Sequence, residues 1–158
     1  MTTKRVFSRY GGYHEAVADE FRSGLEASIA RQLQKAGVPI IYEAYSLRYT
    51  IPAAGHIYTP DFILPNGIII EGKGLFEASD RKKHLYIKEQ WPELDIRFIF
   101  SNPNTRLTKQ SKTSYAMWCE KYGFLYAKLT IPEDWFKEKP KTAEGLIKKK
   151  KKGEKGDK

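Results

Sequence analysis

Residues 58–73 most constrain what this chain can fold into, because they place charged side chains within an otherwise apolar β-hairpin. The turn falls at residues 64–67, which read Leu-Pro-Asn-Gly. Proline at the second position, asparagine at the third and glycine at the fourth are typical of a type I turn. A left-handed Gly67 then gives a three-residue loop with a G1 bulge. The turn chemistry therefore predicts the register of the two strands.

This register brings two carboxylates to one face of the hairpin. It pairs Phe62 with Ile70 and Asp61 with Glu71, and directly paired residues point to the same face. Lys73 lies two residues beyond Glu71 and shares that face. A two-residue loop would instead turn the two carboxylates to opposite faces. An isoleucine-rich strand has no packing reason to hold these charges, so we interpret the hairpin as the metal-binding half of a nuclease site.

The charge balance of the chain favours a polyanionic partner. Its 158 residues hold 28 Lys and Arg against 19 Asp and Glu, which gives a net charge of +9. Such an excess is typical of nucleic-acid-binding proteins, although a protein that is simply basic would show it too. A single cysteine, Cys119, excludes an intrachain disulfide and fits a reducing compartment. We expect no membrane association, because no apolar run approaches the ~20 residues of a membrane span.

The composition divides the chain into three segments. Residues 1–20 are polar, basic and glycine-containing, which predicts a mobile basic arm. Residues 21–138 carry the hairpin and the regular apolar patterns, which predict one folded domain. Residues 139–158 are dominated by lysine, which predicts a disordered tail that adds nonspecific attraction to phosphate.

Helical and strand patterns alternate along residues 21–138, which predicts an α/β domain with a mixed central β-sheet flanked by helices. The first helix follows a capping-box sequence at residues 23–26 and ends near Ala36, before Gly37. The further elements expected are a β-rich stretch at residues 38–50, a bend at 52–55, the hairpin at 56–73, a helix from Ser79 or Asp80 to Gln90, a strand at 95–100, a helix from Thr113 or Ser114 to Tyr122, a strand at 124–129 and a short helix from Pro132.

The hairpin charges suit phosphodiester hydrolysis. That reaction needs a nucleophilic water and a stabilised leaving group, and Mg²⁺ held by carboxylates supplies both. Asp61 and Glu71 are suitable ligands, and the backbone carbonyl of Gly72 is another. Lys73 would orient the attacking water or stabilise charge on the phosphate. The spacing therefore predicts a metal-dependent nuclease.

Several basic residues are candidates for a DNA-binding face. Arg81, Lys82 and Lys83 oppose the dipole of the second helix, which favours a phosphate partner, although a solvated lysine face fits equally. His84 follows them and is a possible DNA contact. His56 could touch a phosphate or the attacking water, but a surface or hinge histidine also fits its position. The remaining candidates are Arg22, Arg106, Lys109 and Lys112.

The motif Pro60-Asp61 followed by Glu71-Gly72-Lys73 resembles the PD-(D/E)xK nuclease superfamily. Further blocks, in the same order, resemble the endonuclease I family of T-seven-like bacteriophages, whose members are Holliday-junction resolvases. The resemblance covers roughly residues 21–138. Its blocks are residues 21–26, 58–62, 64–67, 80–85 and 92–97.

The resemblance implies a restriction-endonuclease-like fold built as an intertwined, domain-swapped homodimer. The chains would exchange across a bridge near residues 43–55. Glu26 would join the site as a metal ligand, from the protomer opposite Asp61, Glu71 and Lys73. Without the resemblance, Glu26 reads as the second member of a capping box, and a side chain bound to its own cap is not free for a metal.

The resemblance also implies an activity. It is a structure-selective DNA endonuclease that resolves four-way junctions and other branched DNA, uses Mg²⁺ or Mn²⁺ with two ions per site, and leaves 5′-phosphates. Its place of action would be the cytoplasm of an infected bacterial host. Reading of shape is physically reasonable, because phosphate contacts carry no base information. A non-catalytic DNA-binding dimer and a sequence-specific restriction-type enzyme are the competing hypotheses.

Overall fold

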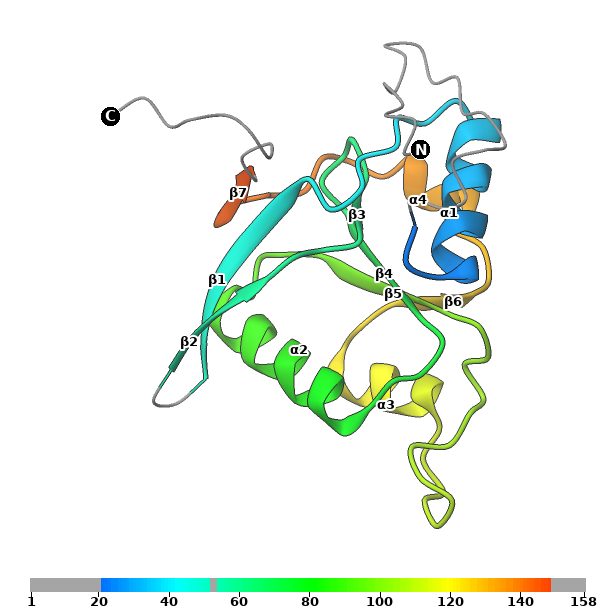
Figure 1. The fold of residues 1–158 in the computed structure, drawn as a ribbon, viewed down its shortest axis with the longest axis vertical. Helices are drawn as coiled ribbons and strands as arrows, with labels where there is room; N and C mark the ends of the chain where they lie inside the picture. Colours follow the sequence, from blue (N-terminus) through cyan, green and yellow to red (C-terminus); the bar gives the residue numbers. More distant parts are fainter. Residues whose placement is uncertain (1–20, 52–53, 149–158) are drawn as a thin grey trace, which may run out of the picture.

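The computed structural model of the chain describes residues 21–51 and 54–148 (Figure 1). The expected N-terminal arm, residues 1–20, lies outside these residues. None of the helices within them is long and apolar enough to span a membrane. The elements are α1 (Gly24–Lys35), β1 (Tyr45–Ile51), β2 (Ala54–Tyr58), β3 (Phe62–Ile63), β4 (Ile69–Lys73), α2 (Ala78–Gln90), β5 (Ile96–Phe100), α3 (Tyr115–Tyr122), β6 (Tyr126–Lys128), α4 (Glu133–Phe136) and β7 (Leu146–Lys148).

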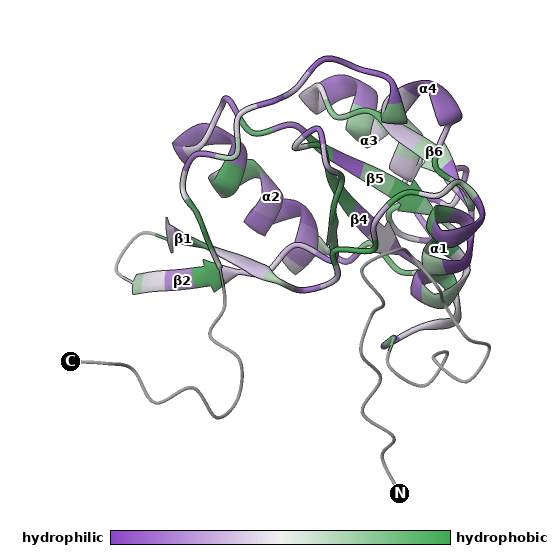
Figure 2. Ribbon diagram, turned by 90° about the horizontal axis from the view of Figure 1, so that it is seen from above, coloured by the Kyte–Doolittle hydropathy of each residue, from purple (hydrophilic) through white to green (hydrophobic). Residues whose placement is uncertain are grey.

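A four-stranded sheet in the order β3-β4-β5-β6 lies at the centre of the fold. β3 and β4 are antiparallel, whereas β4, β5 and β6 run parallel, so the sheet is mixed. Alternating residues supply two cores: Ile69 and Phe98 pack on the side of α2 and α3, and Ile70 and Ile99 pack on the side of α1. Figure 2 shows green stretches in β4 and β5, between helices that carry both green and purple residues. The predicted α/β domain with a mixed, helix-flanked sheet is confirmed.

The turn of the central hairpin has the predicted geometry. The N–H of Gly67 donates to the carbonyl of Leu64 at 2.8 Å, and the N–H of Leu64 donates to the carbonyl of Ile68 at 2.8 Å. Gly67 has a φ of 89°, the left-handed conformation that the bulge requires. Phe62 pairs with Ile70, so the odd loop and its register are confirmed.

A second sheet, in the order β2-β1-β7, was not predicted. β1 and β2 form an antiparallel hairpin from most of the stretch expected to be a bridge, with Ile51 paired to Ala54. Leu146 of β7 pairs with Leu47 of β1. The predicted tail therefore begins too early: residues 139–148 belong to the described fold, and residues 149–158 lie outside it. The lysines around positions 146 and 147 made this segment look disordered in sequence, although two apolar residues occupy these positions.

A buried arginine ties the C-terminal segment to the central sheet. Arg97 of β5 is 2% exposed, and its guanidinium binds both Asp95 at 2.8 Å and Glu138. Lys141 adds a contact to Asp95 at 3.6 Å. Burial opposes ionisation of Asp95, but the hydrogen bonds and charge of Arg97 outweigh it and lower the pKa of that carboxyl. Hydrogen bonds from Arg97 likewise lower the pKa of Glu138.

These shifts predict a loss of stability in acid. A carboxyl whose folded-state pKa is lowered stabilises the fold above its unfolded pKa, and that contribution disappears as the pH falls through the folded value. We therefore expect the free energy of unfolding to fall below about pH 4, where Asp95 and Glu138 gain protons. Urea unfolding between pH 7 and pH 3 measures this. Glu138→Gln should show a shallower pH dependence, and an unchanged slope would contradict the role of the pair.

Candidate active site

Asp61 and Glu71 meet at one edge of the central hairpin, as the register predicts. Asp61 directly precedes β3, and its N–H donates to Oε1 of Glu71 at 3.2 Å. The N–H of Gly72 donates to Oδ2 of Asp61 at 3.0 Å. The backbone of each strand therefore holds the carboxylate of the other strand. Glu71 is 2% exposed, whereas Asp61 is half-buried.

The electrostatics of this edge are unfavourable for two free carboxylates. Burial first, then the charges of Glu71 and Glu26, raise the pKa of Asp61 to about 8. Burial also raises the pKa of Glu71, against the opposing effects of Lys73 and the hydrogen bond from Tyr58. Like charges that are desolvated together favour protonation unless a cation joins them. The site is thus built to accept positive charge.

Lys73 shares the face of Glu71, as predicted, and its ammonium lies 3.3 Å from Oδ1 of Asp80. Burial acts to lower the pKa of Lys73, but Glu71, Asp80 and Asp61 outweigh it and raise the pKa. Lys73 therefore stays protonated at neutral pH and supplies positive charge. Asp80 was expected only as a helix start, and it does cap α2, where its side chain accepts from the N–H of Glu77 at 3.3 Å.

Glu26 of α1 lies beside Asp61 of the same chain. The oxygens of Glu26, Asp61 and a third acid, Glu43, lie within 4.8 Å of one another. Ser23 caps α1 by accepting from the N–H of Glu26 at 3.1 Å, but Glu26 accepts from the N–H of Arg22 at 3.3 Å rather than from Ser23. Only one of the two hydrogen bonds of a capping box is therefore present, the one that Ser23 accepts. The Glu26 carboxylate does not bind the N–H of Ser23. The single chain itself places Glu26 at the site, without the second protomer that the resemblance implied.

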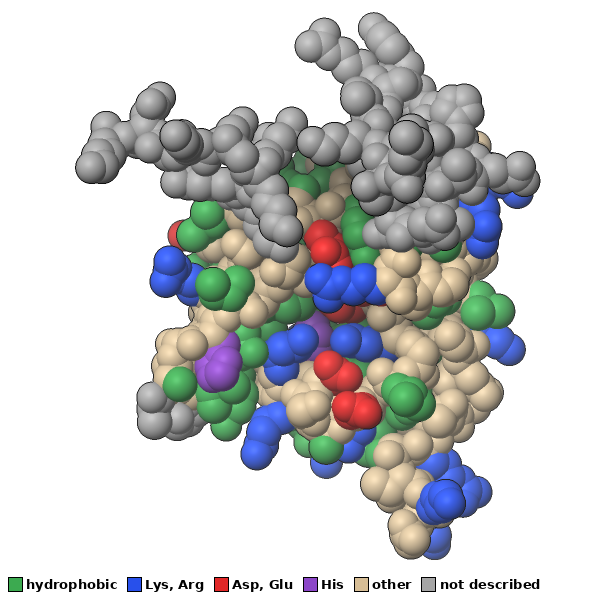
Figure 3. Space-filling model, in the orientation of Figure 1, with side chains coloured by type: hydrophobic (Ala, Val, Ile, Leu, Met, Phe, Trp, Pro, Cys, Tyr) green, Lys and Arg blue, Asp and Glu red, His purple; other side chains and the backbone are tan. Residues whose placement is uncertain are grey.

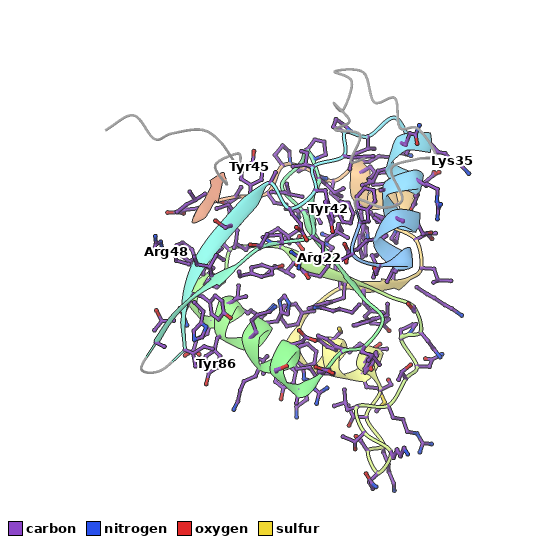
Figure 4. All side chains as sticks on the ribbon, viewed as in Figure 1. Arg22, Lys35, Tyr42, Tyr45, Arg48 and Tyr86 are labelled. Atoms are coloured by element: carbon purple, nitrogen blue, oxygen red, sulfur yellow. The ribbon has the colours of Figure 1, made fainter. Side chains whose placement is uncertain are left out.

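Glu43 was not singled out from the sequence, where it marked only the start of the expected bridge. Its φ of 45° is left-handed, which costs a residue with a Cβ about 1 kcal/mol. Its N–H donates to the carbonyl of Asp61 at 2.8 Å, and its carboxylate binds the guanidinium of Arg22 at 3.0 Å. Figure 4 labels Arg22 next to Tyr42, whose hydroxyl accepts from the Arg22 N–H at 3.4 Å. Arg22 is therefore a neighbour of the carboxylates as well as a candidate DNA contact.

His84 is not available to DNA, which corrects its predicted role. It is 0% exposed and packs edge-on against Tyr58 at 5.2 Å and Phe98 at 4.8 Å between ring centroids. Burial lowers its pKa well below the ordinary value, so it is neutral. On a helix, position 84 shares a face with the buried Ile87 three residues on, and this spacing places it inward.

The other basic candidates lie partly beside the site and partly away from it. Lys83 lies 5.5 Å from the centre of the Tyr58 ring, and Arg81 bonds the carbonyl of Phe76. Figure 3 shows acidic and basic side chains gathered in the middle of one face, and a separate basic group at the tip of the loop between β5 and α3. The exposed members are Arg22, His56, Lys82, Arg106, Lys109 and Lys112.

The donor set fits a hard divalent cation. Asp61, Glu71 and Glu26 each have one oxygen held by the hydrogen bonds described above, and each has a second oxygen to which no described residue donates. Carboxylate oxygens are the ligands that Mg²⁺ and Mn²⁺ prefer. Asp61 is the common member of this set, because it contacts Glu71 on the hairpin and lies within 4.8 Å of Glu26 and Glu43, with the positive charge of Lys73 acting on it.

Comparisons with known proteins agree with this chemistry. A family model described as phage endonuclease I matches residues 8–155. The chain is 52% identical over 132 residues to "Endonuclease I" of Escherichia phage T7. This alignment covers 84% of this chain and 89% of that protein. The chain is 54% identical over 121 residues to "Endodeoxyribonuclease 1" of Enterobacteria phage T3, and this alignment covers 77% of this chain and 80% of that protein.

Proposed function

Because this chain belongs to the phage endonuclease I family and is therefore a nuclease, we propose that it is a metal-dependent endonuclease that resolves four-way junctions and other branched DNA. The two phage proteins compared above are named as an endonuclease and an endodeoxyribonuclease. The observation that carries the proposal is the place of Asp61, which contacts Glu71 on the hairpin and lies close to Glu26 of α1, beside the protonated Lys73. A phage enzyme of this kind would act in the cytoplasm of the infected host.

Asp61, Glu71 and Glu26 would hold Mg²⁺ or Mn²⁺, with the carbonyl of Gly72 as a further ligand and two ions per site. When bound, the metal would activate a water molecule and neutralise charge on the phosphate. The carboxylates of the chain would supply the negative charge that retains the cation. Their burial would limit the access of water that competes with them for the cation.

Lys73 would stabilise the charge that grows on the phosphate oxygens during the reaction. Its raised pKa keeps the ammonium charged, and its contact with Asp80 at 3.3 Å fixes its direction. Water attacks the phosphorus, and the bond to the 3′ oxygen breaks. The products are a 5′-phosphate and a 3′-hydroxyl.

Two separated groups of cations would contact the DNA backbone. One lies at the carboxylates and contains Arg22 and Lys83, and the other lies on the loop that carries Arg106 and Lys109. Contacts of these cations with phosphates carry no base information. We propose that a branched DNA engages both groups at once, so that shape and charge select the substrate.

The active form would be an intertwined homodimer with a restriction-endonuclease-like core. Two sites related by a two-fold axis can cut two opposed strands, as junction resolution requires. In an exchanged dimer, the contacts that place Glu26 beside Asp61 within one chain would form between the two chains instead. The structure of one chain is therefore compatible with a site shared between two.

The activity is tested by mixing the protein with a four-way junction and an excess of linear duplex. With Mg²⁺ we expect cuts on opposed strands near the branch, and with EDTA we expect none. Junctions of different arm sequences should be cut equally, because the proposed selection is by shape. Failure to cut with Mg²⁺ would support the DNA-binding hypothesis, whereas cuts that follow one sequence would support a restriction-type enzyme.

A further inference from the structure

We propose that Tyr58 and Tyr42 are positioning residues that each tie down one oxygen of a metal-binding glutamate and leave the other oxygen for the cation. Tyr58 acts on Glu71, and Tyr42 acts on Glu26. The inference rests on the function proposed above, because it concerns how the metal ligands of that site are oriented.

The contact of Tyr58 with Glu71 is enclosed. Tyr58 lies on β2, is 3% exposed, and donates its hydroxyl hydrogen to Oε1 of Glu71. The same oxygen accepts the N–H of Asp61 at 3.2 Å. A carboxylate oxygen has two lone pairs, so these donors fill Oε1. Only Oε2 remains, which makes Glu71 a ligand through one oxygen.

The ring of Tyr58 has little freedom to turn away. The ring of His84 packs against it edge-on at 5.2 Å between centroids, and the ammonium of Lys83 lies 5.5 Å from its centre. Both of these residues belong to α2. Tyr58 also pairs with Leu47 of β1, so the second sheet and α2 together fix the phenol that binds β4. The orientation of Glu71 therefore depends on elements outside the hairpin.

Tyr42 repeats the arrangement on the other ligand. Its hydroxyl donates to Oε2 of Glu26, and the N–H of Arg22 donates to the same oxygen at 3.3 Å. No described residue donates to Oε1 of Glu26. The ring of Tyr42 packs between Phe21 at 4.6 Å and Phe62 at 5.0 Å, so it too is fixed by the core. Residues that orient metal ligands in this way support affinity without touching the metal.

The test measures metal affinity directly. Mn²⁺ binding to the DNA-free protein is followed by electron paramagnetic resonance for wild type, Tyr58→Phe and Tyr42→Phe. We expect each variant to bind Mn²⁺ roughly 10- to 100-fold more weakly, because the freed carboxylate is no longer held in place. The Mg²⁺ concentration for half-maximal cleavage should rise in parallel, and high Mg²⁺ should restore the rate.

Tyr126→Phe is the matched control, because it removes a Tyr–Glu hydrogen bond, to Glu120 at 2.7 Å, away from the hairpin. It should bind Mn²⁺ as wild type does. The proposal is overturned if both site variants bind Mn²⁺ as tightly as this control, even where their cleavage is slower, since that pattern marks a purely structural role. If the wild type itself neither binds Mn²⁺ nor cuts DNA, the proposed function fails, and the inference fails with it.

Discussion

Glu71→Gln is expected to abolish DNA cleavage and to leave DNA binding in place. The amide retains an oxygen that can accept from Tyr58 and from the N–H of Asp61, so the local fold is kept. The change replaces only the second oxygen, the one assigned to the metal. Loss of a metal ligand removes several kcal/mol of stabilisation, which corresponds to roughly a thousandfold in rate. Single-turnover cleavage of a four-way junction with Mg²⁺ measures the rate, and a gel-shift assay in EDTA measures binding.

Glu120→Gln provides the matched control, because Glu120 accepts a tyrosine hydrogen bond at the surface and should tolerate the change. Thermal unfolding adds a second readout. Burial raises the pKa of Glu71, so a neutral amide should not destabilise the fold. A variant that cuts at the wild-type rate would show that Glu71 is structural, which is the prediction of the non-catalytic hypothesis.

The hairpin could be predicted from sequence because its register is a local property. Proline, asparagine and glycine at residues 65–67 fix the loop length, and the loop length fixes which side chains face each other. Asp61, Glu71 and Lys73 therefore followed from one short stretch. The mixed sheet could be predicted from the alternation of helix and strand patterns, because each pattern is also a local property of the sequence.

The remaining features depend on contacts between distant residues. Tyr58 precedes Asp61 by three residues, but its bond to Glu71 depends on β2, whose place is set by β1 in a separate sheet. β7 pairs with β1 across about a hundred residues, and no local pattern announces that pairing. The prediction that His84 contacts DNA was wrong. Its charged neighbours indicated an exposed position, whereas its helical spacing with the buried Ile87 indicates a buried one. The charged residues of the hairpin could thus be predicted from the sequence, whereas the residues that hold them in place through long-range contacts could not.

The hairpin of β1 and β2 bears on the chain exchange proposed above. Ile51 pairs with Ala54, so only Pro52 and Ala53 connect the two strands. Two-residue connections favour glycine or asparagine with positive φ, whereas proline holds φ near −65°. The connection is thus chemically poor for a tight turn. In the proposed dimer, an extended connection would let β1 pair with β2 of a second copy and would keep the contacts of α1 with β4, because short hinge segments favour domain swapping.

A mixed dimer tests this exchange, with an all-or-none result. One protomer carries Glu26→Ala, the other carries Glu71→Ala, and different affinity tags isolate the heterodimer after co-expression. Each mutant homodimer should be inactive. If Glu26 reaches the hairpin of the opposite chain, the heterodimer has one intact site, formed by the normal Glu26 of one protomer and the normal hairpin of the other. It should then nick a junction on one strand, at about half the wild-type number of cuts.

The opposite result is equally definite, because residues that act within one chain leave each site with one lesion and the heterodimer inactive. A heterodimer of wild type with Glu26→Ala is the control, and it should keep one site under either arrangement. Size-exclusion chromatography with light scattering establishes that the tagged species is a dimer. An inactive heterodimer beside an active control would assign Glu26 and Asp61 to the same chain, as they lie in the single protomer.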